Sequence, residues 1–113
     1  MVKIEAIIQP FKLDDIKTAL DGIGIECITT CEVLEHGATA AVKGFYRGAE
    51  YRLDSPRVKL EILTFPDRAD DVIEVLARAA RTRSSADDGV ILVYGVSDAI
   101  RISTGARVEF AHV

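Results

Sequence analysis

The sequence predicts a single α+β domain in which the elements follow the order βαββαβ. Residues 2–8 alternate apolar and other side chains and end at Pro10, which is typical of a strand with one buried face. Residues 13–23 repeat apolar side chains at helical spacing, and the strand and helix patterns return after residue 56. A continuous apolar run at residues 90–94 then supplies the last strand.

The boundaries of the first helix follow from the residues at its two ends. Asp14 and Asp15 suit the positive end of the helix dipole. Gly22 or Gly24 can take the left-handed conformation that ends a helix. A second strand is expected next, from about Cys27 to Leu34.

The segment 37–55, between the second and third strands, is unusually long for a connection in a small domain. It is punctuated by Gly37, Gly44 and Gly48 and shows no repeatedly apolar face. Connections of this length are usually functional or disordered. We expect an extended loop, and a hairpin extension exposed to solvent is the alternative.

The second half of the chain repeats the strand and helix pattern. The third strand follows Pro56 and ends near Phe65, and Asp67 is expected to cap the second helix. The apolar run at 90–94 predicts a strand that is well covered, and the tail from Ile100 can add a short edge strand. The inner stripe of the second helix is predicted to be Val72, Val75, Leu76 and Ala79.

The order βαββαβ predicts a ferredoxin-like fold, in which two helices cover one face of a four-stranded antiparallel sheet. The opposite face would carry Ile7, Thr29 and Leu63 among charged residues. A face of this kind is more plausibly packed against copies of the same chain than left in water. The sequence therefore predicts a homo-oligomer.

Composition limits the classes of function. A chain of 113 residues with 49% hydrophobic side chains fits one globular domain. Its net charge of −4 gives no overall electrostatic support for binding nucleic acid or an anionic membrane. It contains no apolar run long enough to span a bilayer and no signal-peptide pattern, so the cytoplasm is expected.

The two cysteines are predicted to be unpaired. Cys27 and Cys31 are four residues apart in a predicted strand, which places their Cα atoms about 13 Å apart, beyond the reach of a disulfide. We expect small buried or half-buried thiols. His36 would lie on the other strand face, which disfavours a zinc site shared with them.

Two other classes of function start from His36. An acid–base pair with Glu32 or Glu35 would suggest an enzyme, but the sequence has no nucleophile motif, and we assign no catalytic residue. A metal-binding trimer of the same fold is the other alternative. Its candidate ligands are His36, Cys27, Cys31 and His112.

Three separated stretches resemble the PII signal-transduction family, and together they cover essentially the whole chain. They are Met1–Leu20, Tyr46–Tyr51, and Ala99–Ile102 followed by Thr104 and Gly105. The resemblance implies a homotrimer that binds adenine nucleotides in clefts between subunits. It also implies that segment 37–55 reports the bound state to a partner, which can be an enzyme, a transcription regulator or a membrane transporter contacted without insertion.

The same resemblance assigns the binding residues. Strand residues form the wall of the nucleotide pocket, loop 82–89 holds the phosphates, and the base of the long loop and the C-terminal region complete the site. The nucleotide-binding residues it implies are Ile7, Thr29, Gly37, Ala38, Glu61, Leu63, Asp88, Gly89, Arg101 and Ser103.

Two departures from the family pattern predict a changed nucleotide preference. Val90 stands where the phosphate loop usually ends in a lysine, and Ser103 replaces the second arginine of a pair. Each close charge contact is worth on the order of a few kcal/mol at an effective dielectric near 20, before desolvation. We therefore expect ADP or AMP to bind in preference to ATP.

The second ligand is also expected to differ from that of the family. Thr39 stands at the position of a glutamine that helps hold magnesium and 2-oxoglutarate, Arg57 at that of a carboxylate-binding basic residue, and Glu35 replaces a glycine. Some PII-like relatives with altered phosphate loops are linked to inorganic carbon uptake or carboxysomes, so bicarbonate is a candidate. A nitrogen-regulatory PII protein that senses ATP and 2-oxoglutarate is the alternative.

Two residues of the long loop have open roles. Arg47 is an anion contact or a solvated loop charge. Tyr51 is a site of uridylylation, as in some bacterial members, or an anchor for a partner protein.

Overall fold

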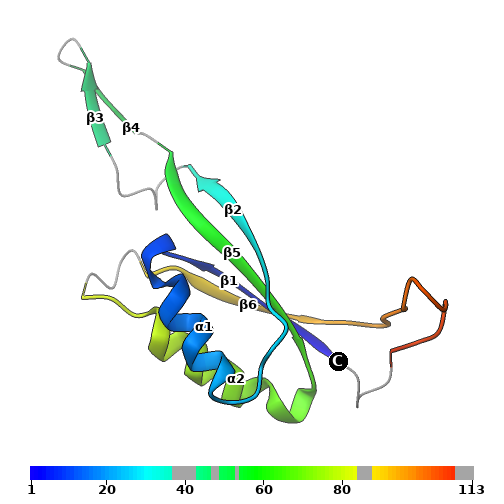
Figure 1. Ribbon diagram of the computed structural model, residues 1–113. Helices are drawn as coiled ribbons and strands as arrows, with labels where there is room; N and C mark the ends of the chain where they lie inside the picture. Colours follow the sequence, from blue (N-terminus) through cyan, green and yellow to red (C-terminus); the bar gives the residue numbers. More distant parts are fainter. Residues whose placement is uncertain (37–42, 47–48, 53, 84–87, 109–113) are drawn as a thin grey trace.

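The computed structural model describes residues 1–36, 43–46, 49–52, 54–83 and 88–108. Four strands form one antiparallel sheet in the order β2-β5-β1-β6, and both helices lie on the same side of it (Figure 1). This arrangement confirms the predicted ferredoxin-like fold. The elements are β1 (Val2–Ile8), the 3-10 turn η1 (Pro10–Lys12), α1 (Leu13–Asp21), β2 (Thr29–Glu35), β3 (Lys43–Tyr46), β4 (Ala49–Arg52), β5 (Ser55–Thr64), α2 (Pro66–Ala80) and β6 (Val90–Gly95).

The hydrophobic core lies between the helices and one face of the sheet. Alternate residues of β1 and β5 point toward the helices, as the strand period of two requires. The helices return buried residues at helical spacing from their inner stripes. The largest fully buried apolar side chains are Ile4, Ile16, Leu20, Leu60, Ile62, Val72 and Leu76.

The helix ends are partly as predicted. Gly24 has a φ of 83° and provides the left-handed residue after α1. The predicted cap at Asp67 is wrong, because α2 starts one residue earlier at Pro66, after Phe65 as N-cap, with no side-chain cap hydrogen bond. Proline at the first helical position is preorganised for the helix, and Asp67 lies in the first turn. Of the predicted stripe, Val72 and Leu76 are buried, while the other two residues are half-buried.

Strand β6 is less covered than its apolar sequence predicts. It lies at the edge of the sheet, and Val90 and Val93 are 51% and 53% exposed. The expectation of a well-covered strand is therefore wrong for a single chain. The tail beyond β6 contributes one isolated bridge, between Ile100 and Arg107, instead of a further strand.

The described part of segment 37–55 contains a hairpin. Strands β3 and β4 pair with each other in an antiparallel two-stranded sheet and project away from the main sheet (Figure 1). Of the two expectations for this segment, the hairpin extension fits these residues better. Strand β5 already begins at Ser55, at the end of the predicted loop.

Cys27 and Cys31 are free, as predicted, but both are exposed in the single chain, so the expectation of buried or half-buried thiols is wrong. Among the described residues, neither helix has the length and apolarity needed to cross a membrane.

Candidate functional site

The face of the sheet opposite the helices, called here the open face, gathers four of the predicted site residues. Thr29 pairs with Glu61 across β2 and β5, and Leu63 follows Glu61 two residues later on the same face. Ile7 on β1 lies between Lys59 of β5 and Val90 of β6. The structure thus brings Ile7, Thr29, Glu61 and Leu63 onto one surface.

Charged side chains on the open face are paired with one another. The Glu61 carboxylate lies 3.9 Å from Lys3 Nζ and 3.8 Å from Lys59 Nζ. Lys3 Nζ also lies 4.7 Å from the centre of the Tyr94 ring, and the Tyr94 hydroxyl donates a hydrogen bond of 3.3 Å to Glu5. Glu61 is therefore held between two cations on the open face, opposite Thr29 in the strand register.

The predicted phosphate loop is closed at its base by Asp88. The Thr82 backbone N–H donates a hydrogen bond of 2.9 Å to Asp88 Oδ1, and the Thr82 hydroxyl donates a second one to the same oxygen. The next residue, Gly89, has a φ of 104°, and a Cβ atom there would lie 1.8 Å from the Ile7 carbonyl oxygen. Only glycine fits this close approach of the loop to β1.

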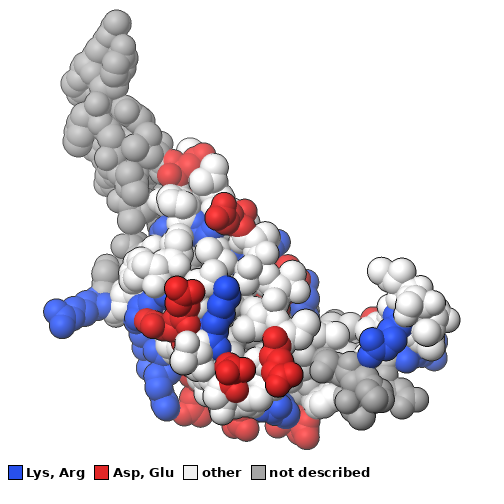
Figure 2. Space-filling model, viewed as in Figure 1, with Lys and Arg blue, Asp and Glu red and all other residues white. Residues whose placement is uncertain are grey.

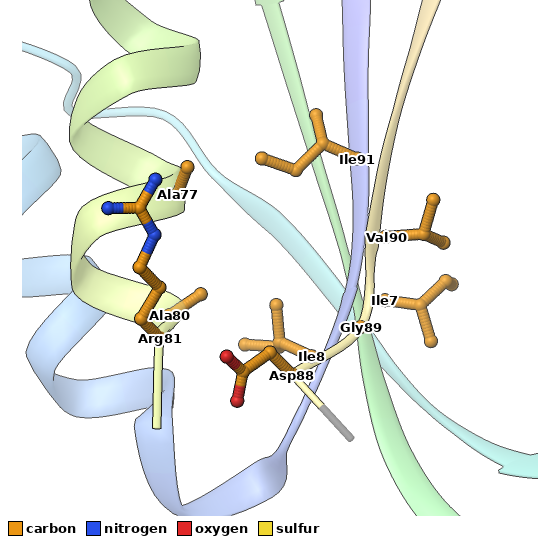
Figure 3. A pocket seen from close by; sticks show the side chains of 9 residues that line it. All are labelled: Ile7, Ile8, Ala77, Ala80, Arg81, Asp88, Gly89, Val90 and Ile91. Carbon is orange, nitrogen blue, oxygen red and sulfur yellow. The ribbon is translucent and has the colours of Figure 1, made fainter. Parts of the chain in front are cut away.

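A cavity of about 350 Å³ lies beside this loop, between α2 and strands β1 and β6. Figure 3 shows Ile8 and Ile91 pointing toward α2, whereas Ile7 and Val90 point to the other side of the sheet. Arg81, at the end of α2, supplies the basic group of the lining. We did not predict Arg81 as a site residue; its position immediately before loop 82–89 is the sequence signal that could have indicated it.

The C-terminal site residues lie at the other end of β6. The N-terminal end of β6 pairs with Ile7, while Gly95 pairs with Val2 and the Val96 N–H bonds to the Met1 carbonyl. A strand of this length spans about 20 Å. The phosphate loop and the turn that carries Arg101 and Ser103 are therefore separated by the length of the strand (Figure 1).

The turn that carries Arg101 and Ser103 is itself ordered by backbone hydrogen bonds. The Arg101 N–H bonds to the Ala106 carbonyl, and the Gly105 N–H bonds to the Arg101 carbonyl, each at 2.8 Å. Asp98 and Arg107 form an ion pair of 2.9 Å across its base. Arg101 and Ser103 are both exposed in the single chain, and among the described residues they lie at the opposite end of β6 from Asp88 and Gly89.

The base of the long loop contains two charge pairs that the sequence analysis missed. Arg57 is 5% exposed, and its Nε lies 3.2 Å from the Glu35 carboxylate. His36 Nδ1 lies 2.6 Å from Asp54 Oδ1 at the exposed side of the same base. Both pairs connect the end of β2 to the chain around the start of β5. The replacement of a family glycine by Glu35 was the available signal for the first pair.

The remaining loop predictions are not tested. Gly37, Ala38, Thr39 and Arg47 lie outside the described residues. Tyr51 belongs to β4, of which the backbone pairing is described.

The alternative readings based on His36 gain no support. Its partner in the structure is Asp54, not Glu32 or Glu35. Within the described part of the chain, no group of three or more histidine, cysteine and acidic residues is placed to hold a metal. His112 lies outside that part.

The side of the molecule drawn in Figure 2 shows acidic and basic side chains interspersed over the helices. Of the predicted nucleotide-binding residues that the structure describes, four lie on the open face and four lie at the two ends of β6: Ile7, Thr29, Glu61 and Leu63, and Asp88, Gly89, Arg101 and Ser103. The fold and the positions of these residues define the class of protein. It is a small ferredoxin-like module with a long insertion between β2 and β5 and a loop beside the sheet that Asp88 closes.

Comparison with known proteins identifies the family. The family model described as "Nitrogen regulatory protein P-II" matches residues 1–106. The nitrogen regulatory protein P-II of Pasteurella multocida is 45% identical over 112 residues, which cover 98% of this chain and 99% of the relative. The proteins of Haemophilus influenzae and Escherichia coli K12, the latter named P-II 1, are 46% and 44% identical with the same coverage. The chain belongs to the nitrogen regulatory protein P-II family, and it is a signalling protein of the PII type.

Proposed function

We propose that this protein is a PII-type regulator that binds an adenine nucleotide between copies of the chain and controls a partner protein through segment 37–55. The division of the site carries this proposal: Asp88 and Gly89 lie at one end of β6, and Arg101 and Ser103 at the other. One chain cannot bring the two halves together, whereas a neighbouring copy can. The exposed apolar residues of β6 favour an assembly in which copies cover the open face. A homotrimer is the assembly that the family resemblance implies.

The regulated process that we favour is nitrogen metabolism. All three relatives described above are named as nitrogen regulatory proteins and match nearly the whole chain. These comparisons support a nitrogen-regulatory PII protein better than the expected link to inorganic carbon and carboxysomes. Bicarbonate is retained only as a candidate second ligand beside 2-oxoglutarate, with Thr39 and Arg57 as its proposed contacts.

For the nucleotide itself, we propose that ADP or AMP binds more tightly than ATP. Val90 follows the phosphate loop without supplying a cation, and Ser103 supplies none at the position of the second arginine of the family pair. Each additional phosphate brings negative charge toward this loop, so the loss of the cation weakens ATP binding most. Arg81 and Arg101 are the described cations proposed to hold the remaining phosphates.

The test is calorimetric titration of the purified protein with ATP, ADP and AMP, each with and without 2-oxoglutarate or bicarbonate. We expect ADP or AMP to bind at least tenfold more tightly than ATP. ATP binding that is the tightest and is strengthened by 2-oxoglutarate would overturn the nucleotide preference and support the alternative.

A matched pair of variants tests the cause of the preference. Val90→Lys should restore ATP affinity by about tenfold, the effect of roughly 1.4 kcal/mol from one partly screened charge contact. Val93→Lys places the same charge on β6 at an equally exposed position on the helix side of the sheet. Equal gains in the two variants would show that net charge, and not the position of residue 90, sets the affinity.

A further inference from the structure

A second cleft lies on the helix side of the sheet, between α1 and the segment that connects this helix to β2 (Figure 1). Its volume is about 400 Å³, within the range of roughly 300–1,000 Å³ that is usual for small-molecule sites. Its lining residues are Lys17, Thr18, Asp21, Ile25, Glu26 and Ile28. None of them is among the nucleotide-binding or second-ligand residues named above, so the cleft is available to a ligand of a different kind.

The turn that forms one wall of this cleft is fixed by hydrogen bonds. The Ile23 and Ile25 N–H groups both bond to the Leu20 carbonyl, at 3.1 and 3.0 Å. Gly24 between them has the left-handed conformation described above. From α2, Arg68 Nη2 donates a hydrogen bond of 2.5 Å to the Ile23 carbonyl. The wall is therefore ordered in the ligand-free chain, and binding does not have to order it.

The charged side chains that border the cleft have no ion-pair partners in the part of the chain that the structure describes. Lys17 and Asp21 are four residues apart on α1, the spacing at which opposite charges pair on a helix surface. They do not pair with each other, although Lys12 and Asp15 at the start of the same helix lie 3.9 Å apart. Glu26, on the connecting segment, is exposed. One ammonium group and two carboxylates are thus available to a ligand.

This set of groups matches a zwitterion better than a simple ion. An anion at Lys17 also meets two carboxylates, and a cation between those carboxylates leaves Lys17 without a partner. A ligand that carries both an ammonium and a carboxylate group places each of its charges beside an opposite one. Ile25 and Ile28 supply an apolar surface next to the charges, which suits an aliphatic side chain. A free α-amino acid combines these three features.

We propose that this cleft binds a free α-amino acid with an aliphatic side chain. Lys17 pairs with the carboxylate of the ligand, and Asp21 and Glu26 pair with its ammonium group. The two isoleucines pack against its side chain. The proposal goes beyond the proposed function, because the cleft shares no residue with the nucleotide site or with segment 37–55. It gives the protein a further small-molecule ligand that binds without the nucleotide.

The test is titration of the full chain with L-leucine at constant pH and ionic strength, followed by the backbone amide resonances of Ile25, Glu26 and Ile28. Two probes remove one charge each: 3-methylbutylamine is L-leucine without the carboxylate, and 4-methylpentanoate is L-leucine without the ammonium group. L-leucine should bind at least about threefold more tightly than either probe, the effect of one exposed charge contact. The absence of a saturable shift with L-leucine would overturn the proposal, as would equally tight binding of either probe.

Two variants separate the two charges of the ligand. Lys17→Gln should weaken L-leucine binding by at least about threefold and should not weaken the binding of 3-methylbutylamine. Glu26→Gln should weaken the binding of L-leucine and of 3-methylbutylamine, and not that of 4-methylpentanoate. Both side chains are exposed, so neither substitution removes a buried contact. An unchanged affinity for L-leucine in both variants would contradict the assigned contacts.

Arg78→Gln and Glu74→Gln are the matched controls. They remove the same charges from exposed positions on α2, outside the cleft, where the two side chains lie 2.8 Å apart. Neither should change the affinity for L-leucine. An equal loss in a control and in the corresponding cleft variant would overturn the proposal, because it would indicate a general effect of net charge. No nucleotide is present, so failure here leaves the nucleotide titrations unaffected, and failure of those titrations leaves this result standing.

Discussion

The two faces of the main sheet differ in burial and in charge, although the same strands form both. On β5, Leu60 and Ile62 point toward the helices and are 0% and 1% exposed. On the open face of the same strand, Lys59 and Glu61 form ion pairs, and Leu63 is 36% exposed. One strand thus stabilises the single chain through one face and presents binding residues through the other.

This difference separates residues that specify the fold from residues that specify the function. A buried apolar side chain contributes to stability wherever a core forms, whatever the protein binds. The paired charges and exposed apolar groups of the open face contribute little to the stability of one chain. These groups contribute binding energy when a ligand or another copy of the chain covers them.

The largest expected effect comes from the core. Leu60→Ala should lower the free energy of unfolding by about 3 kcal/mol, because it removes a fully buried side chain and leaves a cavity. Urea unfolding at a fixed subunit concentration measures the loss. Leu63→Ala, the same substitution on the open face, should cost less than half as much but weaken nucleotide binding. Equal stability losses would contradict the separation of the two faces.

A smaller effect is expected at the point where the phosphate loop meets β1. Gly89→Ala should cost about 1–3 kcal/mol of stability and lower nucleotide affinity at least tenfold, because a Cβ atom there meets the Ile7 carbonyl. Gly24→Ala is the control, since Gly24 also has a positive φ but open space around it. If both variants keep full nucleotide affinity, the close approach at Gly89 is irrelevant to binding.

The closure of the phosphate loop by Asp88 should contribute less to stability than the fit at Gly89. Asp88→Asn removes the charge that accepts two hydrogen bonds from Thr82, and we expect a loss of about 1–2 kcal/mol in unfolding experiments. Asp71→Asn, at an exposed position of α2, should change stability by less than about 0.5 kcal/mol. A loss in Asp88→Asn no larger than in this control would mean that the loop closes without Asp88.

The smallest effect is expected at His36. Its pair with Asp54 is exposed on both sides, and exposed ion pairs contribute about 0–1 kcal/mol. His36→Ala should therefore leave stability within about 1 kcal/mol and nucleotide affinity within twofold. Stoichiometric metal in the purified protein that disappears in this variant would instead favour the metal-binding alternative.

The sequence predicted the element order and one face of the sheet because periodicity reports which side chains are buried together. Alternation in β1 and β5 and the stripes of both helices were sufficient for this. Periodicity does not report whether a side chain is buried by its own chain or by a neighbouring copy. For that reason the apolar sequence of β6 predicted a buried strand, whereas β6 is an exposed edge strand in the single chain. The exposed cysteines reflect the same limit.

The candidate site was predicted only where it follows strand register or the family resemblance. Ile7, Thr29, Glu61 and Leu63 meet on one face because their register places them there. The contacts of Glu35 with Arg57 and of Thr82 with Asp88 join residues 22 and six positions apart, which no local pattern encodes. The hairpin formed by β3 and β4 was underestimated because its strands are short and lack an apolar face.

The most direct test of the account asks whether one nucleotide site is built from two copies of the chain. Gly89→Ala and Arg101→Ala should each abolish ADP binding measured by calorimetry, because each damages a different half of every site. When the two variants are unfolded, mixed in equal amounts and refolded together, we predict that roughly a quarter of the sites regain both intact halves in a cyclic assembly and bind ADP. A mixture that binds no more ADP than the separate variants would contradict a site shared between neighbouring copies.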